Sequence, residues 1–211
     1  MRHLALLALP LAVWAQTAPP DTTAILRGVE KRYNSTSTLQ AAFTMTFKDR
    51  GRPRLPERGT LYLSKPNRTR WEYSTPAGDL FLSDGKFTYD YNKQKNTTER
   101  APFKETDDMR IPLSFLLGKL DFQKDFDSYT GKRDGTDTLI TLTPRNKKLL
   151  FKEIALVVTP DFTIRHVTVT DQAGTSAMEY DLDAEQRNMK LADALFKFAA
   201  PPGARVVEVR E

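Results

Sequence analysis

GTLYLSKPNRTRWEYSTPAGDLFLSDGKFTYDY, residues Gly59–Tyr91, contains four short runs in which apolar residues recur at every second position. This period is typical of strands with one apolar face. Turn residues separate the runs: Lys65-Pro66-Asn67, Pro76-Ala77-Gly78 and Ser83-Asp84-Gly85. Asp-Gly between alternating runs is among the strongest hairpin signals. The stretch therefore predicts a four-stranded antiparallel meander, with these side chains on one apolar face: Leu61, Leu63, Trp71, Tyr73, Leu80, Leu82, Phe87, Tyr89 and Tyr91.

Alternating runs also flank this meander. Leu39–Asp49 predicts a long strand before it, and Asn96–Arg100 predicts a weaker strand after it. Further strands, separated by turn residues, are predicted at Ser128–Lys132, Thr138–Thr143, Phe151–Thr159, Thr163–Asp171 and Thr175–Leu182. About eleven strands, nearly all beside their sequence neighbours, predict a mainly β fold that curls into a barrel or a deeply bent sheet. We expect Ala184–Leu195 to be a helical turn or irregular.

Two segments interrupt the β pattern and predict helices. Asp21 is a candidate N-cap for a helix that ends near Asn34, with Ile25, Leu26, Val29 and Tyr33 on one side. Arg110–Gly118 has Pro near its start and Gly at its end, and its apolar residues are Leu113, Phe115, Leu116 and Leu117. A helix that is apolar on nearly all sides must be buried or must contact an apolar surface. Because two helices cannot wrap the outside of so large a sheet, we expect them to cover its concave face.

The N-terminus predicts export. Arg2 and His3 precede the apolar run Leu4–Val13, and Val13-Trp14-Ala15 places small residues at the positions that a signal peptidase requires. The alternative is a membrane anchor, but a run of this length is too short to span a bilayer. We therefore expect a signal peptide over residues 1–15, cleaved after Ala15, a linker over 16–20, and a single domain over 21–211.

The residue types exclude most catalytic chemistry. The chain has no Cys, and once His3 has left with the signal peptide, His166 is the one remaining histidine. Thiol nucleophiles, Cys-based metal sites and multi-histidine metal sites are therefore excluded. The carboxylate pairs Asp107-Asp108 and Asp125/Asp127 are interpreted as solvated. We expect no catalytic residue, no metal and no cofactor; a hydrolase built on Ser83 and His166 is the weakest alternative.

The net charge of +5, which becomes +4 without Arg2, is spread along the chain. Two interpretations remain open: a solvated surface, or weak attraction to an anionic membrane. No nucleic-acid partner is expected, because an exported chain without a recognition motif gives no reason for one.

After the signal peptide, the first helix and the AAFTM strand, the chain contains four further motifs in a fixed order: GTLYLSKPNRTRWEY, LFLSDGKFTYDYN, IPLSFLLG and LADALFKFAAPPGARVVEV. This ordered set resembles the periplasmic outer-membrane lipoprotein carrier family (LolA-like), over essentially all of the mature chain. The resemblance implies an incomplete, unclosed antiparallel β-barrel with an α-helical lid over an apolar cavity. It also implies a monomeric periplasmic carrier, not an enzyme. Such a carrier receives acylated lipoproteins from an inner-membrane ABC exporter and passes them to an outer-membrane acceptor, and it contacts the membrane surface transiently.

The resemblance turns the apolar residues into candidate lipid-binding residues. The candidate cavity lining is Phe43, Met45, Phe47, Leu61, Leu63, Trp71, Tyr73, Leu80, Leu82, Phe87, Tyr89, Ile140 and Leu142. The candidate lid is Ile25, Leu26, Val29, Leu113, Phe115, Leu116 and Leu117. Plain core packing is the alternative for every one of these residues, since aromatic stripes in strands are usually core. The cargo is also open: a phospholipid or glycolipid carrier and a lipid-sensing domain share the fold.

One position departs from the family pattern. The basic residue before the proline of the first hairpin is typically Arg in this family, where it bonds the lid, and here it is Lys65. Lysine keeps the charge and the donors but lacks the planar guanidinium fork. We therefore expect Lys65 to be the lid latch, looser or differently made than an arginine. Arg68 or Arg70 could share this role, or could face solvent.

Overall fold

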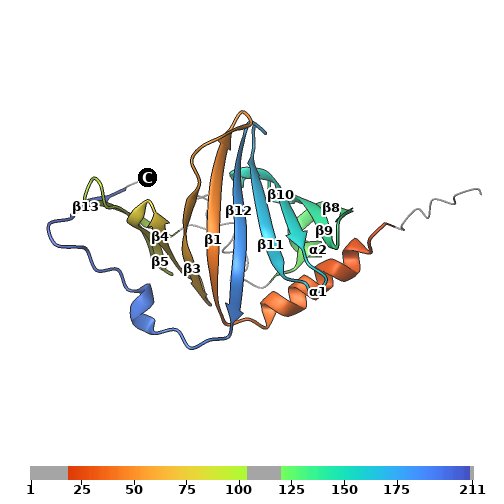
Figure 1. Ribbon diagram of the computed structural model, residues 1–211, viewed down its shortest axis with the longest axis horizontal. Helices are drawn as coiled ribbons and strands as arrows, with labels where there is room; N and C mark the ends of the chain where they lie inside the picture. Colours follow the sequence, from red (N-terminus) through yellow and green to blue (C-terminus); the bar gives the residue numbers. More distant parts are fainter. Residues whose placement is uncertain (1–18, 104–119, 210–211) are drawn as a thin grey trace, which may run out of the picture.

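The computed structural model describes residues 19–103 and 120–209, in which strands predominate (Figure 1). The helices are α1 (Thr22–Asn34), α2 (Phe122–Asp125) and the 3-10 turn η2 (Asp193–Phe196). The strands are β1 (Thr38–Asp49), β2 (Arg52–Pro53), β3 (Glu57–Ser64), β4 (Arg68–Thr75), β5 (Ala77–Asp84), β6 (Phe87–Asn92), β7 (Thr97–Pro102), β8 (Phe126–Asp134), β9 (Asp137–Pro144), β10 (Phe151–Val158), β11 (Ile164–Asp171), β12 (Ser176–Arg187) and β13 (Arg205–Glu208). No helix within the described ranges is long and apolar enough to cross a membrane.

The strands of the described residues form one 13-stranded sheet that does not close. Its order is β13-β7-β6-β5-β4-β3-β1-β12-β11-β10-β9-β8, with β2 paired to β1. Two antiparallel meanders, β1 to β7 and β8 to β12, therefore meet where β1 pairs with β12. The predicted mainly β, unclosed antiparallel architecture is confirmed.

The two strands beyond the predicted eleven have weak sequence signals. β2 has two residues, and β13 has four at the end of the chain. β13 also pairs in parallel with β7, with Arg205 opposite Thr97, whereas hairpin signals predict antiparallel neighbours only. β12 continues to Arg187 through part of the segment that was expected to be irregular.

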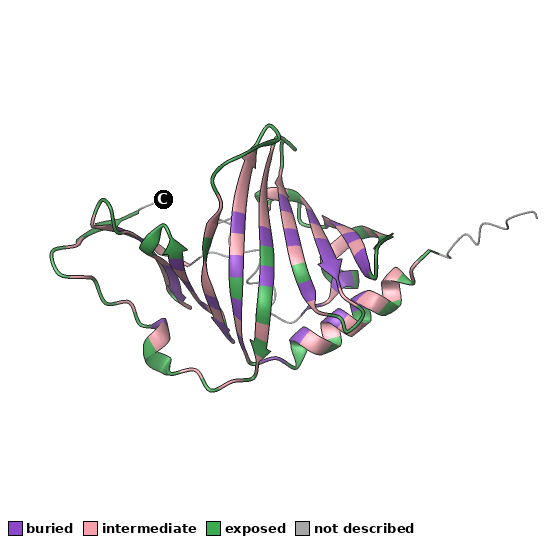
Figure 2. Ribbon diagram, viewed as in Figure 1, coloured by how far each residue is buried: buried purple, intermediate pink, exposed green. Residues whose placement is uncertain are grey.

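Strand register defines an inner, concave face of the sheet. On β1 the buried residues Leu39, Ala41, Phe43 and Met45 alternate with more exposed ones, as Figure 2 shows. Ala41 is opposite Leu61 of β3, Leu61 is opposite Trp71 of β4, and Trp71 is opposite Phe81 of β5. Because paired residues project from the same side of a sheet, these side chains share the inner face.

The prediction of one shared apolar face for Gly59–Tyr91 is wrong for β5 and β6. Leu82 is opposite Arg70 and Tyr89, so it projects from the outer face, as do Leu80, Phe87, Tyr89 and Tyr91. Leu80-Phe81-Leu82 is apolar at three consecutive positions, so alternation alone does not say which residue points inward. A register shift between Glu72 and Ser74 sets the pairing, and a shift of one residue exchanges the two faces.

The last part of the chain covers this outer apolar surface. From β12 it runs as a long connection past η2 to β13 (Figure 1, blue). Phe198 stacks on Tyr89 with ring centroids 4.6 Å apart, and the Arg68 guanidinium lies 5.0 Å from the Phe196 ring. η2 packs against β4 and β5. Leu82 is consequently fully buried although it does not face the concave side.

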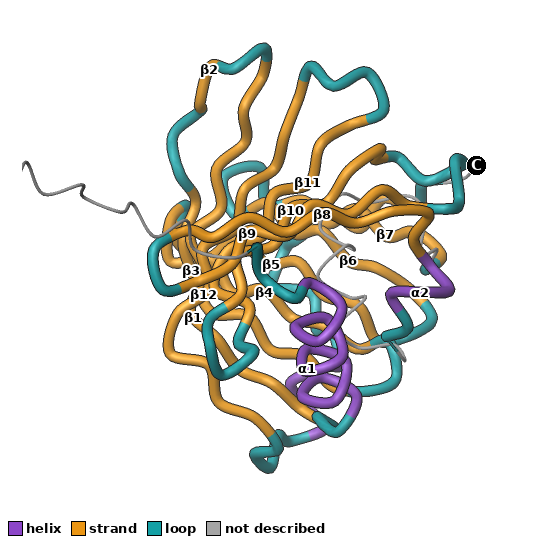
Figure 3. Tube along the Cα trace, turned by 90° about the vertical axis from the view of Figure 1, so that its right-hand side faces the viewer, coloured by secondary structure: helices purple, strands orange, loops and turns teal. Residues whose placement is uncertain are grey.

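Helix α1 begins where the sequence predicts. The Asp21 carboxylate accepts a hydrogen bond from the Ala24 N–H at 3.0 Å, as an N-cap should. Leu26, Val29 and Tyr33 are buried in the same apolar cluster as the inner-face strand residues. In Figure 1 the helix crosses the lower ends of β10 and β11, and Figure 3 shows it nearly end-on.

A polar network fixes the C-terminal end of α1 to β11 and β12. The buried Tyr33 hydroxyl donates to Glu185 at 2.7 Å and accepts from the Ile164 N–H at 2.9 Å. Arg32 donates to the same carboxylate at 2.7 Å and to Asp161 at 3.3 Å. Burial and then the neighbouring Glu185 charge raise the pKa of Tyr33 well above its usual value, so its proton stays available for the bond to Glu185.

Gly59 offers a test of the sheet packing. It stands between Phe43 and Tyr73 in adjacent strands, and a Cβ there would overlap the Glu72 carbonyl oxygen. We expect Gly59→Ala to lower the free energy of unfolding by about 1–3 kcal/mol, because backbone must move. Gly28→Ala is the matched control: the three atoms nearest its Cβ, which it would overlap, all belong to the exposed Phe162 ring, a side chain that can rotate away, and alanine favours a helix by up to about 1 kcal/mol. Urea denaturation measures both, and an equal loss in the two variants would contradict the packing argument.

Tyr33→Phe tests the network beneath α1. The change leaves the Glu185 carboxylate and the Ile164 N–H without this partner, so we expect unfolding to cost about 1–3 kcal/mol less than in the unmodified chain. Tyr62→Phe is the control, because no hydrogen bond joins that hydroxyl to the described part of the chain. It should change stability by less than about 0.5 kcal/mol. If thermal or urea unfolding gave equal values for both variants, the network would not fix the helix.

Candidate functional site

An aromatic cluster occupies the centre of the inner face. The ring centroids of Phe43 and Trp71 are 4.8 Å apart, those of Phe43 and Tyr73 are 5.3 Å apart, and those of Trp71 and Tyr180 are 5.7 Å apart. The rings meet edge to face or tilted, which is the favourable arrangement for aromatic pairs. These side chains come from β1, β4 and β12, so the cluster spans the seam between the two meanders.

Nine of the thirteen predicted lining residues project from the inner face, as paired register places them: Phe43, Met45, Phe47, Leu61, Leu63, Trp71, Tyr73, Ile140 and Leu142. The other four, Leu80, Leu82, Phe87 and Tyr89, project from the outer face. Further inner-face residues, not among the predicted lining, are Phe81, Ile154, Leu156, Val167, Val169 and Tyr180. Alternation within the predicted strands could have identified the last five, since each lies at an every-second-residue position.

The predicted lid residues are placed unevenly. On α1, Leu26 and Val29 are buried against the inner face, and Ile25 packs beside them partly buried. They cover the part of the sheet near β8 to β11, where Thr23 and Tyr129 also share a 3.2 Å hydrogen bond. The other four candidates, Leu113, Phe115, Leu116 and Leu117, lie outside the described residues.

Lys65 contacts α1. It lies in the turn between β3 and β4, and its ammonium group donates to the Tyr33 carbonyl at 2.8 Å and to the Asn34 carbonyl at 3.4 Å. The last carbonyls of a helix have no partner within the helix, and the helix dipole makes this end negative. A lysine is therefore well suited to this position. Burial lowers the pKa of Lys65, because desolvation disfavours the charged ammonium group.

Arg68 and Arg70 bond another segment. Arg68 pairs with Asp193 at 2.9 Å, and Arg70 donates to the Leu195 carbonyl at 3.1 Å. Both arginines thus hold the C-terminal segment on the outer face. Of Lys65, Arg68 and Arg70, only Lys65 contacts α1 within the described part of the chain.

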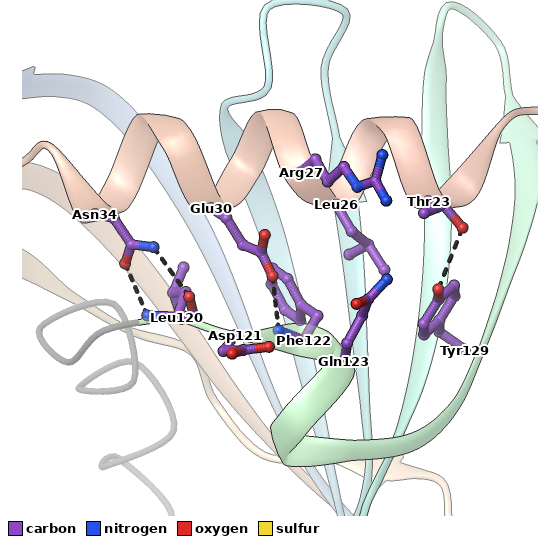
Figure 4. Close-up of a pocket in the computed structure, with 10 residues that line it drawn as sticks. All are labelled: Thr23, Leu26, Arg27, Glu30, Asn34, Leu120, Asp121, Phe122, Gln123 and Tyr129. Atoms are coloured by element: carbon purple, nitrogen blue, oxygen red, sulfur yellow. Dashed lines mark hydrogen bonds between the residues drawn. The ribbon is translucent and has the colours of Figure 1, made fainter.

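A second set of bonds ties α1 to the segment that precedes α2. The Asn34 side chain donates to the Leu120 carbonyl at 2.9 Å and accepts from the Leu120 N–H at 2.7 Å, so it pairs with Leu120 as a peptide group would (Figure 4). Glu30 accepts from the Phe122 N–H at 2.7 Å. These three bonds fix residues 120–122 to one side of the helix.

Between α1, α2 and β8 lies a pocket of about 340 Å³. Figure 4 shows the residues that line it: Thr23, Leu26, Arg27, Glu30, Asn34, Leu120, Asp121, Phe122, Gln123 and Tyr129. Most of these side chains are polar or charged. This pocket therefore lacks the apolar lining expected of an acyl-chain cavity, and it does not contain the aromatic cluster.

The residues considered for catalysis have structural partners. His166 projects from the outer face of β11, with Nδ1 2.7 Å from Asp181 and Nε2 3.0 Å from Thr168. The buried Ser83 hydroxyl donates to the Asn67 carbonyl at 3.1 Å and accepts from the Gly85 N–H at 3.2 Å, so it stabilises two turns. These contacts give no support to a Ser83–His166 hydrolase.

The structure describes one of the two carboxylate pairs that were interpreted as solvated. Asp125 is exposed, and Asp127 pairs with Lys147 at 3.0 Å and with Arg145 at 3.5 Å. Asp107 and Asp108 lie outside the described residues. Over residues 19–103 and 120–209, no group of three or more His, Cys, Asp or Glu side chains could hold a metal ion.

Several curated proteins of similar sequence carry the same description. The chain is 27% identical over 209 residues to an "Outer-membrane lipoprotein carrier protein" of Methylococcus capsulatus, covering 96% of each chain. It is 28% identical over 205 residues to a protein of the same description from Chromohalobacter salexigens, covering 96% of this chain and 93% of the relative.

A solved structure with a similar fold is an uncharacterized conserved protein of Thermus thermophilus, with a TM-score of 0.52 and 15% sequence identity. The match covers 90% of this chain and all of that one, and at this identity it supports the fold alone. Residues 34–199 match the family model described as "Outer membrane lipoprotein carrier protein LolA", a family of carriers and not of enzymes. This match spans most of the chain, including the strands that form the aromatic cluster, and the protein belongs to the LolA family.

Proposed function

We propose that this protein is a periplasmic carrier that binds the acyl chains of lipoproteins released from the inner membrane and transfers them to the outer membrane. The observation that carries the proposal is the continuous apolar inner face around Trp71, in a chain that belongs to the LolA family. Such a surface offers dispersion contacts and desolvation, which suit saturated hydrocarbon and give no specific polar recognition. A signal peptide over residues 1–15, which lie outside the described residues, would direct the chain to the periplasm.

The proposed acyl-binding surface differs from the one that alternation alone predicts. It comprises the nine inner-face candidates around Phe43 and Trp71, together with Phe81 and Tyr180. Leu80, Leu82, Phe87 and Tyr89 are not included, because the C-terminal segment covers the outer face from which they project.

A carrier must release its cargo, and this limits how tightly it can bind. Each buried CH₂ contributes about 0.8 kcal/mol, so full burial of three long acyl chains would contribute a binding free energy on the order of tens of kcal/mol. This exceeds the practical ceiling of about 20 kcal/mol for non-covalent binding. Most of the inner-face residues are already buried in this structure, so cargo must displace existing contacts. The cost of that displacement offsets much of the gain.

We propose that Lys65 takes part in this exchange as the latch on α1. Its bonds to the Tyr33 and Asn34 carbonyls join the β3–β4 turn to the helix end. Ile25, Leu26 and Val29 form the part of the lid that belongs to α1. Leu113, Phe115, Leu116 and Leu117, outside the described residues, remain the sequence-based prediction for the rest.

The proposed partners follow from the cargo. They are an inner-membrane ABC exporter that supplies the acylated lipoprotein, an outer-membrane acceptor, and the membrane surface in transient contact. The carrier itself would act as a monomer without a cofactor.

Depletion of the protein tests the function directly. We expect acylated lipoproteins to accumulate at the inner membrane of depleted cells, as measured by membrane fractionation. Mass spectrometry of the protein purified from the periplasm should find acylated lipoprotein bound. Recovery of free phospholipid or glycolipid alone, with lipoproteins correctly sorted after depletion, would replace this function with carriage of another amphiphile.

Lys65→Leu tests the latch. Without the bonds to α1 we expect altered exchange: loaded protein that fails to release its lipoprotein, or poorer loading from inner-membrane vesicles. Lys65→Arg, which keeps a cation at this site, should retain transfer, and Lys86→Leu in the exposed β5–β6 turn is the control for adding an apolar side chain. Release of labelled lipoprotein from vesicles measures loading and transfer. Unchanged kinetics in Lys65→Leu would remove Lys65 from the mechanism.

A further inference from the structure

Three loops meet at the end of the sheet farthest from α1. They connect β1 to β3 (residues 50–56, including β2), β9 to β10 (residues 145–150) and β11 to β12 (residues 172–175). The Arg50 N–H donates to the Thr175 carbonyl at 2.7 Å, and the Gln172 side chain donates to the Leu149 carbonyl at 2.7 Å. These bonds join the loops into one surface, which we call the basic tip. Figure 3 shows the β2 loop projecting beyond the sheet.

The loops of the basic tip carry a net positive charge, although acidic residues lie at their edges: Asp49 opposite Arg52, Glu57, Asp127 and Asp171. Its loops contain six basic and no acidic residues: Arg50, Arg52, Arg54, Arg145, Lys147 and Lys148. The turns at the other end of the strands include Asp84, Asp134 and Asp161. Both ends of the strands carry basic residues, but the three loops of the basic tip hold six of them and no acidic residue of their own, which creates a local positive potential.

Four of these six cations make no ion pair within the described part of the chain: Arg50, Arg52, Arg54 and Lys148. Arg145 and Lys147 pair with Asp127. Arg50, Arg52 and Lys148 are exposed, and the Arg54 guanidinium lies 4.8 Å from the centroid of the Phe47 ring. Phosphate oxygens of a ligand could thus contact these groups without breaking an internal bond.

Apolar side chains project from the same surface. Leu55, between Arg54 and Pro56, is 91% exposed, and Leu150 is 45% exposed. Single exposed leucines are common on protein surfaces. Leu55 on the β1–β3 loop and Leu150 on the β9–β10 loop lie on the same surface as the exposed cations, so this surface combines charge attraction with apolar groups that can leave water.

We propose that the basic tip is a docking surface for an anionic phospholipid bilayer. Leu55 enters the boundary between headgroups and acyl chains, and Arg50, Arg52 and Lys148 contact the lipid phosphates. A narrow projecting loop suits insertion between headgroups better than a protein partner, because a specific protein interface needs a broad complementary area.

The tip also lies where the inner face ends. Phe47 of β1 and Met178 of β12 are paired, half-buried inner-face residues next to these loops. Docking therefore brings the edge of the apolar face to the bilayer surface. The biological purpose of this arrangement rests on the proposed carrier function, whereas the docking itself is measured without any lipoprotein.

Sedimentation with lipid vesicles tests the docking. The full chain should bind vesicles of equal parts phosphatidylglycerol and phosphatidylcholine, should bind pure phosphatidylcholine far less, and should lose affinity as salt is raised. The triple variant Arg50→Gln/Arg52→Gln/Lys148→Gln should lose about a hundredfold in affinity, and Leu55→Asn about tenfold. All four residues are exposed, so thermal melting should be unchanged.

The matched control is Lys31→Gln/Lys86→Gln/Lys190→Gln, which removes the same charge from exposed lysines at the other end of the strands. It should retain most of the binding. Equal losses in the two triple variants, or no binding of the unmodified chain to anionic vesicles, would overturn the proposal. Binding of a fluorescent fatty acid measures the apolar face separately, and the tip variants should keep it. Loss of acyl binding with intact docking would instead contradict the carrier function.

Discussion

The antiparallel pairing of β1 with β12 is the interaction on which the rest of the structure depends. It joins two meanders that are otherwise separate in sequence, and it places Phe43 opposite Leu182 and Met45 opposite Tyr180. Without this pairing neither meander has a complete apolar face, because the aromatic cluster draws rings from both. The same pairing brings Glu185 beneath α1 at one end of the strands and Thr175 beside Arg50 at the other. Helix attachment and the basic tip are both consequences of one register.

The attachments of α1 restrict how the inner face can open. Its C-terminal end is held by Glu185, by the Ile164 N–H, by Lys65 and, through Asn34, by the segment before α2. Within the described residues, its N-terminal half has fewer such bonds: one hydroxyl contact links Thr23 to Tyr129. The polar contacts that hold α1 are therefore concentrated at its C-terminal end, where the proposed Lys65 latch lies. Residues 120–122 are joined to the same helix, because Glu30 and Asn34 both bond them.

Much of the fold could be predicted from the sequence, because alternation and turn chemistry are local signals. The β1 strand, the β3–β4 turn at Lys65 and the Asp21 cap all depend on residues within a few positions of each other. The face of Leu82 could not be predicted, since it depends on a bulge in the neighbouring strand and on cover from Phe196 and Phe198, far along the chain. β13 was missed for the same reason.

The candidate site shows the same limit. Nine lining residues were found because each lies in a strand with clear alternation, and Lys65 because its motif matched a family pattern. Tertiary structure brings the helix carbonyls to Lys65. It also places Arg68 and Arg70 on the outer face, where the C-terminal segment supplies their partners. No local pattern encodes them.

The C-terminal cover on the outer face has a consequence for folding order. β13 pairs with β7, and the Phe198 ring stacks on Tyr89 of β6. Both contacts join segments about a hundred residues apart in a chain of 211. Contacts of such high sequence separation form late and slow the folding of a domain. Until the last residues of the chain are in place, Leu82 and Tyr89 of the first meander therefore stay uncovered. Such transiently exposed apolar surface is prone to aggregation.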